Sequence, residues 1–338
     1  MDLTLPSSIT QVLLIEDSSQ IGYARRTAQK LAERLGFDEA DAGRVALVVT
    51  ELCSNILKHA SRGELHLRTL PRPQGQGLEA IAVDRGQGFD VGACLADGYS
   101  TGGTQGIGLG AIARQAEVFD VYADARGAVL LARFFRRGDK APDIAIGVTQ
   151  HSLHDDPACG DAFQVRISDQ GISAVVIDGL GHGEEAERAA RAGTAAFGLA
   201  PFSAPALLLE DLHQAMAGTR GGAAALVQFD PVADRLQFLG IGNIGATVLG
   251  PERGRGLASH PGIVGGQYRK AQGFDYAQVS GQCLILYSDG LQSRWNLIDY
   301  PGLIFRHPAV IATVLHRDFC RGRDDVTVLV IALEMPHA

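Results

Sequence analysis

The sequence has no excess of basic charge and no long apolar run, and each absence excludes a class of protein. It carries 30 lysines and arginines against 38 aspartates and glutamates, a formal charge of −8, which argues against nucleic-acid binding by phosphate neutralisation. No apolar stretch approaches the roughly 20 residues that span a membrane. Residues 1–11 lack the basic start and apolar core of a signal peptide. We therefore expect a cytoplasmic protein with neither a nucleic-acid nor a membrane partner.

Paired cysteines are also lacking. The five cysteines are scattered, none belongs to a CxxC pair, and none has an arginine six residues later. The loop of a cysteine-nucleophile phosphatase is therefore absent, and reduced, buried thiols are the expectation. The cysteines are Cys53, Cys94, Cys159, Cys283 and Cys320.

The 338 residues suffice for two globular domains, with 46% hydrophobic and 20% charged residues. A charged, proline-ended connector at residues 136–142 separates two halves. We expect a first domain at residues 1–137, a linker at 138–143 and a second domain at 144–338.

The first half opens with a short strand at residues 13–16 and two helices. Asp17 or Ser18 can begin the first helix, which should end near Leu35 because Gly36 follows. Asp38 can begin the second helix, whose apolar residues recur on one face. Further strands are expected at residues 64–70, 78–83, 121–123 and 128–135, and a helix at residues 112–118.

Three polar or glycine-rich groups of the first half suit a nucleotide. Glu51 and Asn55 are four residues apart and therefore share a helix face, where an Asn can bind a phosphate-bound Mg²⁺ and a carboxylate can accept a proton. Asp84 ends a strand before Gly86 and Gly88. A loop at residues 102–110 then opens a helix, a suitable place for phosphate. Each group alone is more often a solvated helix face or an ordinary turn.

The order Glu-x-x-x-Asn, Asp-x-Gly-x-Gly, Gly-x-Gly-x-Gly resembles the GHKL ATPase and kinase superfamily. The stretches VVTELCSNILKHA and DGYSTGGTQGIGLGAI resemble its RsbT branch of serine kinases over about residues 8–135. The resemblance implies an α/β sandwich that binds ATP with Mg²⁺, although the family often has Gly-Thr where this chain has Gly127-Ala128. By that resemblance Asn55 is the Mg²⁺ ligand, Glu51 the general base, Asp84 with Gly86 and Gly88 the adenine corner, and Gly106, Gly108 and Gly110 the phosphate loop.

In the second half, three aspartates stand at strand ends. Asp178 follows an apolar run and precedes Gly179 and a helix-like segment at residues 184–197. Asp289 ends another apolar run, and Asp324 comes just before a third. Strand-end carboxylates that are distant in sequence can converge on a divalent cation. A single Asp-Gly pair is more often only a turn.

The set CGD (159–161), DGLGHG (178–183), SDG (288–290) and RDDVT (323–327) resembles the SpoIIE/RsbX group of PPM serine/threonine phosphatases over about residues 144–334. The resemblance implies an α+β β-sandwich with flanking helices and two Mn²⁺ or Mg²⁺ ions. Asp178, the Gly179 carbonyl, Asp289 and Asp324 would hold these ions. Asp161 would hold a metal-bound water or a further ion. Asp325 would support the ligands, and His182 is a weaker candidate for proton transfer.

The two resemblances together imply a partner-switching protein. The expected substrate is a STAS-domain phosphoprotein, either an antagonist or a stressosome-like scaffold, which the second domain dephosphorylates. The first domain would phosphorylate or dock the same class of partner. The alternative is a phosphatase with a non-catalytic N-terminal module that senses nucleotide or docks the partner. A sensor histidine kinase fits poorly, because no phosphoacceptor-histidine helix pair precedes Glu51.

Overall fold

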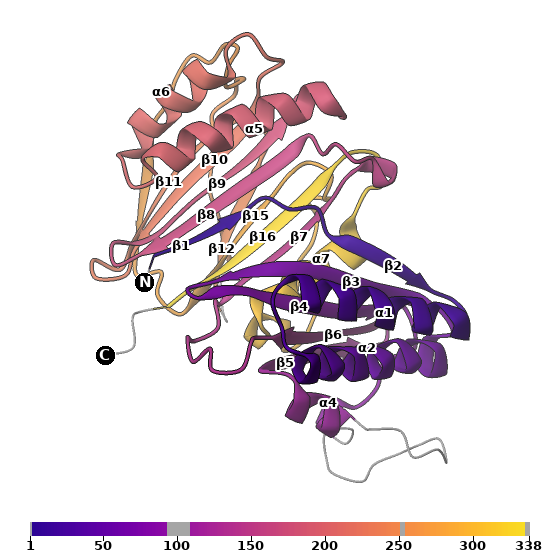
Figure 1. The fold of residues 1–338 in the computed structure, drawn as a ribbon. Coiled ribbons are helices and arrows are strands. Elements are labelled where there is room, and N and C mark those ends of the chain that lie inside the picture. Colours follow the sequence, from indigo (N-terminus) through magenta and orange to yellow (C-terminus); the bar gives the residue numbers. More distant parts are fainter. Residues whose placement is uncertain (1, 93–108, 251–253, 335–338) are drawn as a thin grey trace. The chain divides into compact units, whose positions relative to one another are not determined.

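A computed structural model describes residues 2–92, 109–250 and 254–334, which form two compact units. We call residues 1–9, 145–297 and 315–338 the sandwich unit, and residues 10–144 and 298–314 the single-sheet unit. Each is described separately (Figure 1).

The single-sheet unit is one antiparallel sheet of five strands, in the order β2-β3-β4-β6-β5. Helices α1 and α2 lie side by side on one face of this sheet (Figure 1). The bounds are β2 Gln11–Ile15, α1 Ser18–Arg34, α2 Glu39–Ala60, β3 Gly63–Arg72, β4 Gly75–Asp84, α4 Leu109–Gln115, β5 Val118–Asp124 and β6 Gly127–Phe134.

Both long helices of this unit begin where the sequence predicts. The Asp17 side chain accepts a hydrogen bond from the backbone N–H of Ser19 at 2.8 Å, and Gln20 completes a capping box. Asp38 caps α2 in the same way, accepting from the N–H of Asp41 at 2.7 Å. These aspartates satisfy N–H groups that the first turn of a helix leaves without partners.

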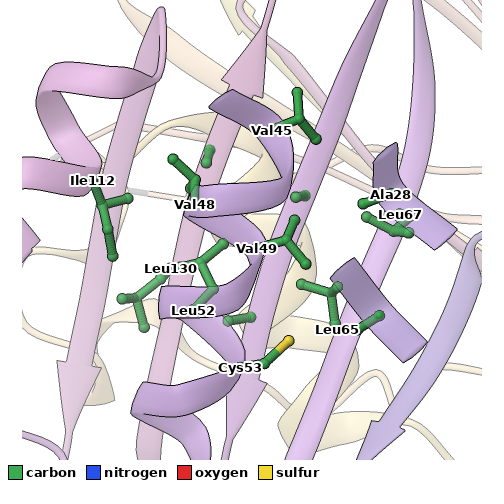
Figure 2. Packing of buried hydrophobic residues seen from close by; sticks show 14 of the residues in the cluster. Ala28, Val45, Val48, Val49, Leu52, Cys53, Leu65, Leu67, Ile112 and Leu130 are labelled. Atoms are coloured by element: carbon green, nitrogen blue, oxygen red, sulfur yellow. The ribbon is translucent and has the colours of Figure 1, made fainter. Parts of the chain in front are cut away.

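The core of the single-sheet unit lies between the helices and the sheet. Figure 2 shows Val45, Val48, Val49 and Leu52 extending from α2 toward strand residues such as Leu130. All of these side chains are buried. Because α2 buries this face, Glu51 and Asn55, which point elsewhere, remain half-buried.

The sandwich unit has two antiparallel sheets, in the orders β1-β8-β9-β10-β11-β14 and β13-β12-β15-β16-β7. Helices α5 and α6 cover the outer face of the six-stranded sheet (Figure 1). The strands are β1 Leu3–Pro6, β7 Ile146–His151, β8 Asp161–Ser168, β9 Gly171–Gly179, β10 Gly222–Asp230, β11 Arg235–Ile241, β12 Gly245–Leu249, β13 Gly254–Gly256, β14 Phe274–Ala277, β15 Gln282–Tyr287 and β16 Val326–Leu333. Helices α5 Glu184–Leu199 and α6 Pro205–Met216 and the short 3₁₀ turn η1 Leu153–Asp155 also belong to this unit. The 3₁₀ turn η3 Leu303–Phe305 belongs to the single-sheet unit, and the segments η2 Leu297–Asp299 and α7 Pro308–Phe319 are each divided between the two units.

Strand β9 shows why the six-stranded sheet is a middle layer. Ala174 and Val176 belong to the core between the two sheets, whereas Val175 and Ile177 belong to the core under α5 and α6. Successive strand residues point to opposite faces, so a continuous apolar run is required when both faces are covered. Asp178 lies at the end of this apolar run.

Strand β1 was not expected from the sequence. Residues Leu3–Pro6 pair with β8 of the sandwich unit, with Leu5 opposite Val165. The chain therefore supplies a sandwich strand before it enters the single-sheet unit. Residues 298–314 likewise belong to the single-sheet unit, although they follow Asp289 in the sequence. The division thus differs from the domain bounds expected above at these two segments.

The expected architecture is present in both parts: the single-sheet unit is an α/β sandwich of helices on one sheet, and the other unit is an α+β β-sandwich with flanking helices. Among the described cysteines, Cys53, Cys159, Cys283 and Cys320 form no disulfide. Burial raises the pKa of Cys53 to about 12 and that of Cys283 to about 11, which disfavours reactive thiolates. Cys94 lies outside the described residues.

No helix within the described ranges is long and apolar enough to cross a bilayer.

Candidate metal and nucleotide sites

The carboxylates singled out in the second half meet where the two sheets of the sandwich unit approach each other. Asp161 begins β8 and lies opposite Asp178 in the neighbouring strand β9. Asp289 follows β15, and Asp324 precedes β16, the strand paired with β15. Antiparallel pairing therefore places two aspartates at one end of each sheet.

Hydrogen bonds connect the two sheets at this point. The hydroxyl of Ser288 donates to Asp161 Oδ2 at 2.6 Å, and the backbone N–H of Thr327 donates to Ser288 Oγ at 2.9 Å. The backbone N–H of Asp289 donates to the carboxylate of Asp178. The acidic corners of the two sheets are thus held together by the Ser288 hydroxyl and by the backbone N–H of Asp289.

Asp325 holds a loop in place. Its Oδ1 accepts from the N–H of Leu153 and its Oδ2 from the N–H of Gly160, both at 2.7 Å. The side chain is buried. With both oxygens engaged by backbone, Asp325 fixes the chain on the approach to Asp161.

The glycines of the DGLGHG loop are required by close packing. A Cβ on Gly179 would lie 2.3 Å from the carbonyl oxygen of Ala186 in α5. Gly181 and Gly183 have φ of +86° and +76°, which residues with a side chain rarely adopt. The loop therefore turns tightly from β9 into α5 beside Asp178, and it leaves His182 exposed.

Burial and mutual repulsion dominate the electrostatics of these carboxylates. Burial, followed by the charges of Asp289 and Asp324, raises the pKa of Asp178 to about 7. Burial, followed by the charge of Asp178, raises the pKa of Asp161 well above its usual range. Burial also raises the pKa of Asp324, whereas the nearby His182 lowers it. A cation among these groups would relieve the repulsion.

The arrangement has the donors that Mg²⁺ and Mn²⁺ prefer, since carboxylate and carbonyl oxygens predominate. Across residues 2–92, 109–250 and 254–334, however, no three His, Cys, Asp or Glu side chains converge closely enough to hold a metal ion. The aspartates therefore raise one another's pKa values but do not form a complete coordination site.

Asn243 is a site residue that the sequence reasoning missed. It follows β11, and its Nδ2–H donates to Asp289 Oδ2 at 2.8 Å. A Cβ on the preceding Gly242 would lie 2.5 Å from the Cβ of Ala223, so the backbone passes close to β10 before reaching Asn243. The sequence Gly-Ile-Gly-Asn at residues 240–243 did indicate a loop before a core strand, and this was the available signal.

In the single-sheet unit, Asp84 anchors the candidate adenine corner. It is 8% exposed at the end of β4. Its Oδ1 accepts from the N–H of Gly86 at 2.8 Å and from the N–H of Ala128 at 3.2 Å. An ionised carboxylate has about four acceptor positions, so Asp84 can also accept from an adenine amino group.

The end of α2 lies against this corner. A Cβ on Gly86 would lie 3.0 Å from both the Cβ of Ala60 and the carbonyl oxygen of His59. Asn55 lies about one turn earlier in the same helix, with Glu51 one turn before it. Gly110 lies in α4. Gly106 and Gly108 lie outside the described residues.

Comparisons with known proteins identify relatives of the first part of the chain. The model of the histidine kinase-like ATPase domain family matches residues 16–134. The serine/threonine-protein kinase RsbT of Bacillus subtilis (strain 168) is 32% identical over 99 residues, covering 29% of this chain and 74% of RsbT.

Two solved structures each resemble somewhat more than half of the chain. One, described as "The bacterial stressosome: a modular system that has been adapted to control secondary messenger signaling", is 26% identical with a TM-score of 0.52. It covers 56% of this chain and 99% of its own. The structure of RsbX in complex with magnesium is 21% identical with a TM-score of 0.49, covering 54% of this chain and 92% of its own.

The chain therefore joins a histidine kinase-like ATPase domain to a two-sheet β-sandwich. Through its first part it belongs to the RsbT-like family of these ATPase domains.

Proposed function

We propose that the chain is a partner-switching protein that removes phosphate from serine or threonine of a STAS-domain protein. The observation that carries this proposal is the meeting of Asp178, Asp289 and Asp324 at one end of a PPM-type sandwich. The RsbT likeness and the stressosome context of a similar structure support a STAS partner, as antagonist or scaffold.

In this proposal Asp178, Asp289, Asp324 and the Gly179 carbonyl hold two Mn²⁺ or Mg²⁺ ions. Such ions supply an acidified water and neutralise charge on a phosphate. The residues of the chain set the geometry. Asp178, which accepts from the N–H of Asp289, would be a ligand of these ions, and Asp161, which accepts from the Ser288 hydroxyl, would hold a metal-bound water or a further ion.

The single-sheet unit is proposed to bind ATP with Mg²⁺. Asn55 would be the Mg²⁺ ligand, Asp84 would accept from the adenine amino group, and Gly86 and Gly88 would let the base approach. Glu51 would accept the proton of a substrate hydroxyl as phosphate is transferred. Kinase action on the same class of partner follows from the RsbT likeness.

A non-catalytic first unit, which senses nucleotide or docks the partner, is the second candidate. One observation favours it. Ala128 approaches Asp84 with its backbone N–H at 3.2 Å and has no hydroxyl to offer, where related domains often carry threonine. Adenine recognition then relies on Asp84 alone.

The proposal is tested by incubating the full chain with a phosphorylated STAS-domain protein and Mn²⁺, and separately with its unphosphorylated form, ATP and Mg²⁺. We expect phosphate loss in the first reaction, and gain in the second if the unit is a kinase. A variant disabled at Asp289 should lose only the first activity, and one disabled at Glu51 only the second. Absence of phosphate release by the wild type would refute the phosphatase assignment.

Replacement of Asn243 by alanine is expected to weaken Mn²⁺ binding about 10–100-fold, the usual effect of removing a group that orients a metal ligand. The reason is loss of the hydrogen bond from Asn243 to Asp289. Gln237→Ala is the matched control, because this amide also donates to an aspartate, Asp275, at 3.0 Å on β11. Calorimetric titration with Mn²⁺ measures both. Equal affinity in the two variants would remove Asn243 from the site.

Replacement of Asn55 by alanine is expected to weaken ATP–Mg²⁺ binding about tenfold or more, because a charge-assisted contact is lost. Glu51→Ala should spare binding and remove phosphotransfer, since it removes only the base. The controls are Gln29→Ala and Glu33→Ala, an amide and a carboxylate on α1. Calorimetry and transfer of labelled phosphate are the measurements. A wild type that does not bind ATP would overturn the nucleotide site.

A further inference from the structure

Residues 298–314 are the structurally unexpected part of the chain. In the sequence they lie between Asp289 and Asp324, two candidate metal ligands of the sandwich unit. In the structure they belong to the single-sheet unit. The segment that connects Asp289 to Asp324 is thus part of the single-sheet unit.

The turn between β5 and β6 holds the beginning of this segment through Arg126. Its Nη2 donates to the carbonyl oxygen of Asp299 at 2.7 Å, and its guanidinium carbon lies 3.6 Å from the centre of the Tyr300 ring. Asp124 fixes the guanidinium, accepting from Nε at 2.9 Å. Arg126 therefore makes a hydrogen bond to Asp299 and a cation–π contact with Tyr300.

Asp120 and Asp143 hold the middle of the segment. The backbone N–H of His307 donates to Asp120 Oδ2 at 2.6 Å. The ring Nε2 of His307 lies 3.0 Å from Asp143 Oδ2. Arg306 Nη1 lies 3.3 Å from Asp120 Oδ1. The segment is thus attached to the rest of the single-sheet unit at its beginning and near its middle.

The same β5–β6 turn also contacts the candidate adenine corner. A Cβ on Gly88 would lie 2.1 Å from the carbonyl oxygen of Asp124, and one on Gly127 would lie 2.1 Å from that of Asp84. The Ala128 N–H donates to the Asp84 carboxylate itself. The backbone around Asp84 and the β5–β6 turn are therefore closely packed. Because close-packed groups cannot move independently, a shift of one displaces the other.

We propose that nucleotide bound at the Asp84 corner regulates the phosphatase site through the β5–β6 turn, with Arg126 as the residue that transmits the effect to Asp299 and Tyr300. The inference rests on the proposed function, because it requires an ATP site and a phosphatase site. The segment that receives the effect continues directly to Asp289 on one side and toward Asp324 on the other.

Coupling of this kind requires that nucleotide bind two arrangements of the turn with different affinity. Couplings between distinct sites usually amount to about 5–150-fold, and they act equally in both directions for binding. ATP should therefore change the affinity of the phosphatase site for Mn²⁺. Emptying that site should change the affinity for ATP by the same factor.

The experiment uses the full chain, its Arg126→Ala variant and the control Arg25→Ala, an exposed arginine on α1. Phosphate release from a phosphorylated STAS-domain protein is measured at low substrate with and without ATP. Calorimetry gives the ATP affinity of the wild type and of Asp289→Asn. Hydrogen exchange follows the amides of residues 298–306 with and without ATP.

We expect ATP to change phosphate release at least about fivefold in the wild type and in Arg25→Ala. Arg126→Ala should keep the rate without ATP and keep ATP binding, yet lose the response in both the rate and the exchange of residues 298–306. If ATP binds and phosphate is released with no mutual effect, the coupling is overturned while the proposed function stands. A response that survives in Arg126→Ala also overturns it. Failure of ATP to bind overturns both.

Discussion

Replacement of Asp178 by asparagine is expected to reduce phosphate release by at least about 10³-fold, while the fold is retained. Asp178 lies between Asp161 of the neighbouring strand and the backbone N–H of Asp289. An amide there removes the negative charge that a pair of divalent cations requires. Metal ions in such sites contribute several kcal/mol to the transition state, and about 1.4 kcal/mol corresponds to a factor of ten.

The matched control is Asp169→Asn. Asp169 is an exposed carboxylate in the turn between β8 and β9, at the end of β9 opposite to Asp178. It should retain wild-type activity. Phosphate release with Mn²⁺, with Mg²⁺ and with chelator is the measurement, and activity should vanish with chelator. A fully active Asp178→Asn protein, shown to contain no bound metal, would overturn the assignment of the site.

Local signals in the sequence predict most of the secondary structure. The caps Asp17 and Asp38 and the apolar face of α2 place the first helices almost to the residue. The apolar run before Asp178 predicts β9 because a strand covered on both faces needs no alternation. The helix expected at 112–118 begins and ends earlier, at Leu109–Gln115, and Val118 already belongs to β5.

Features that depend on distant partners could not be predicted. Strand β1 has only four residues, and it becomes a strand because it can pair with β8, far along the chain. Nothing in residues 298–314 indicates attachment to the single-sheet unit, because the determinants, such as Asp120 and Arg126, lie elsewhere in the sequence. A pattern within one segment carries no information about such contacts.

Some features of the candidate sites could likewise be predicted from the sequence, and others could not. The order of the acidic corners around Asp178, Asp289 and Asp324 could be read from the sequence, because each joins a strand to a glycine or a charged turn. The hydrogen bond from Asn243 to Asp289 could not, because it joins a loop after β11 to the end of β15. The sequence therefore indicates the candidate ligands, and the tertiary structure identifies what orients them.

The largest effect on stability is expected at Arg133, which is fully buried on β6. Its Nε donates to Glu79 Oε2 at 2.8 Å, and its Nη1 lies 3.0 Å from both oxygens of Asp143. Burial alone would lower the pKa of Arg133, but the charges of Glu79 and Asp143 outweigh it and raise the pKa. Arg133→Met should cost about 3–5 kcal/mol in the free energy of unfolding, because Glu79, 1% exposed, loses its hydrogen-bonded partner and keeps only the charge of the neighbouring Arg68.

The double variant Arg133→Met, Glu79→Leu separates charge from packing. Replacing both members of a buried ion pair by apolar groups is often neutral, so the double variant should recover part of the stability lost by Arg133→Met. The recovery is partial because buried Arg68 loses the charge of Glu79. Hydrogen exchange of amides in β4 and β6 reports on the single-sheet unit. Fluorescence of Trp295, the single tryptophan of the chain, reports on the sandwich unit and is the internal control. A double variant as unstable as Arg133→Met would contradict the account based on the charge of Glu79. A stable single variant would show that Glu79 does not need Arg133.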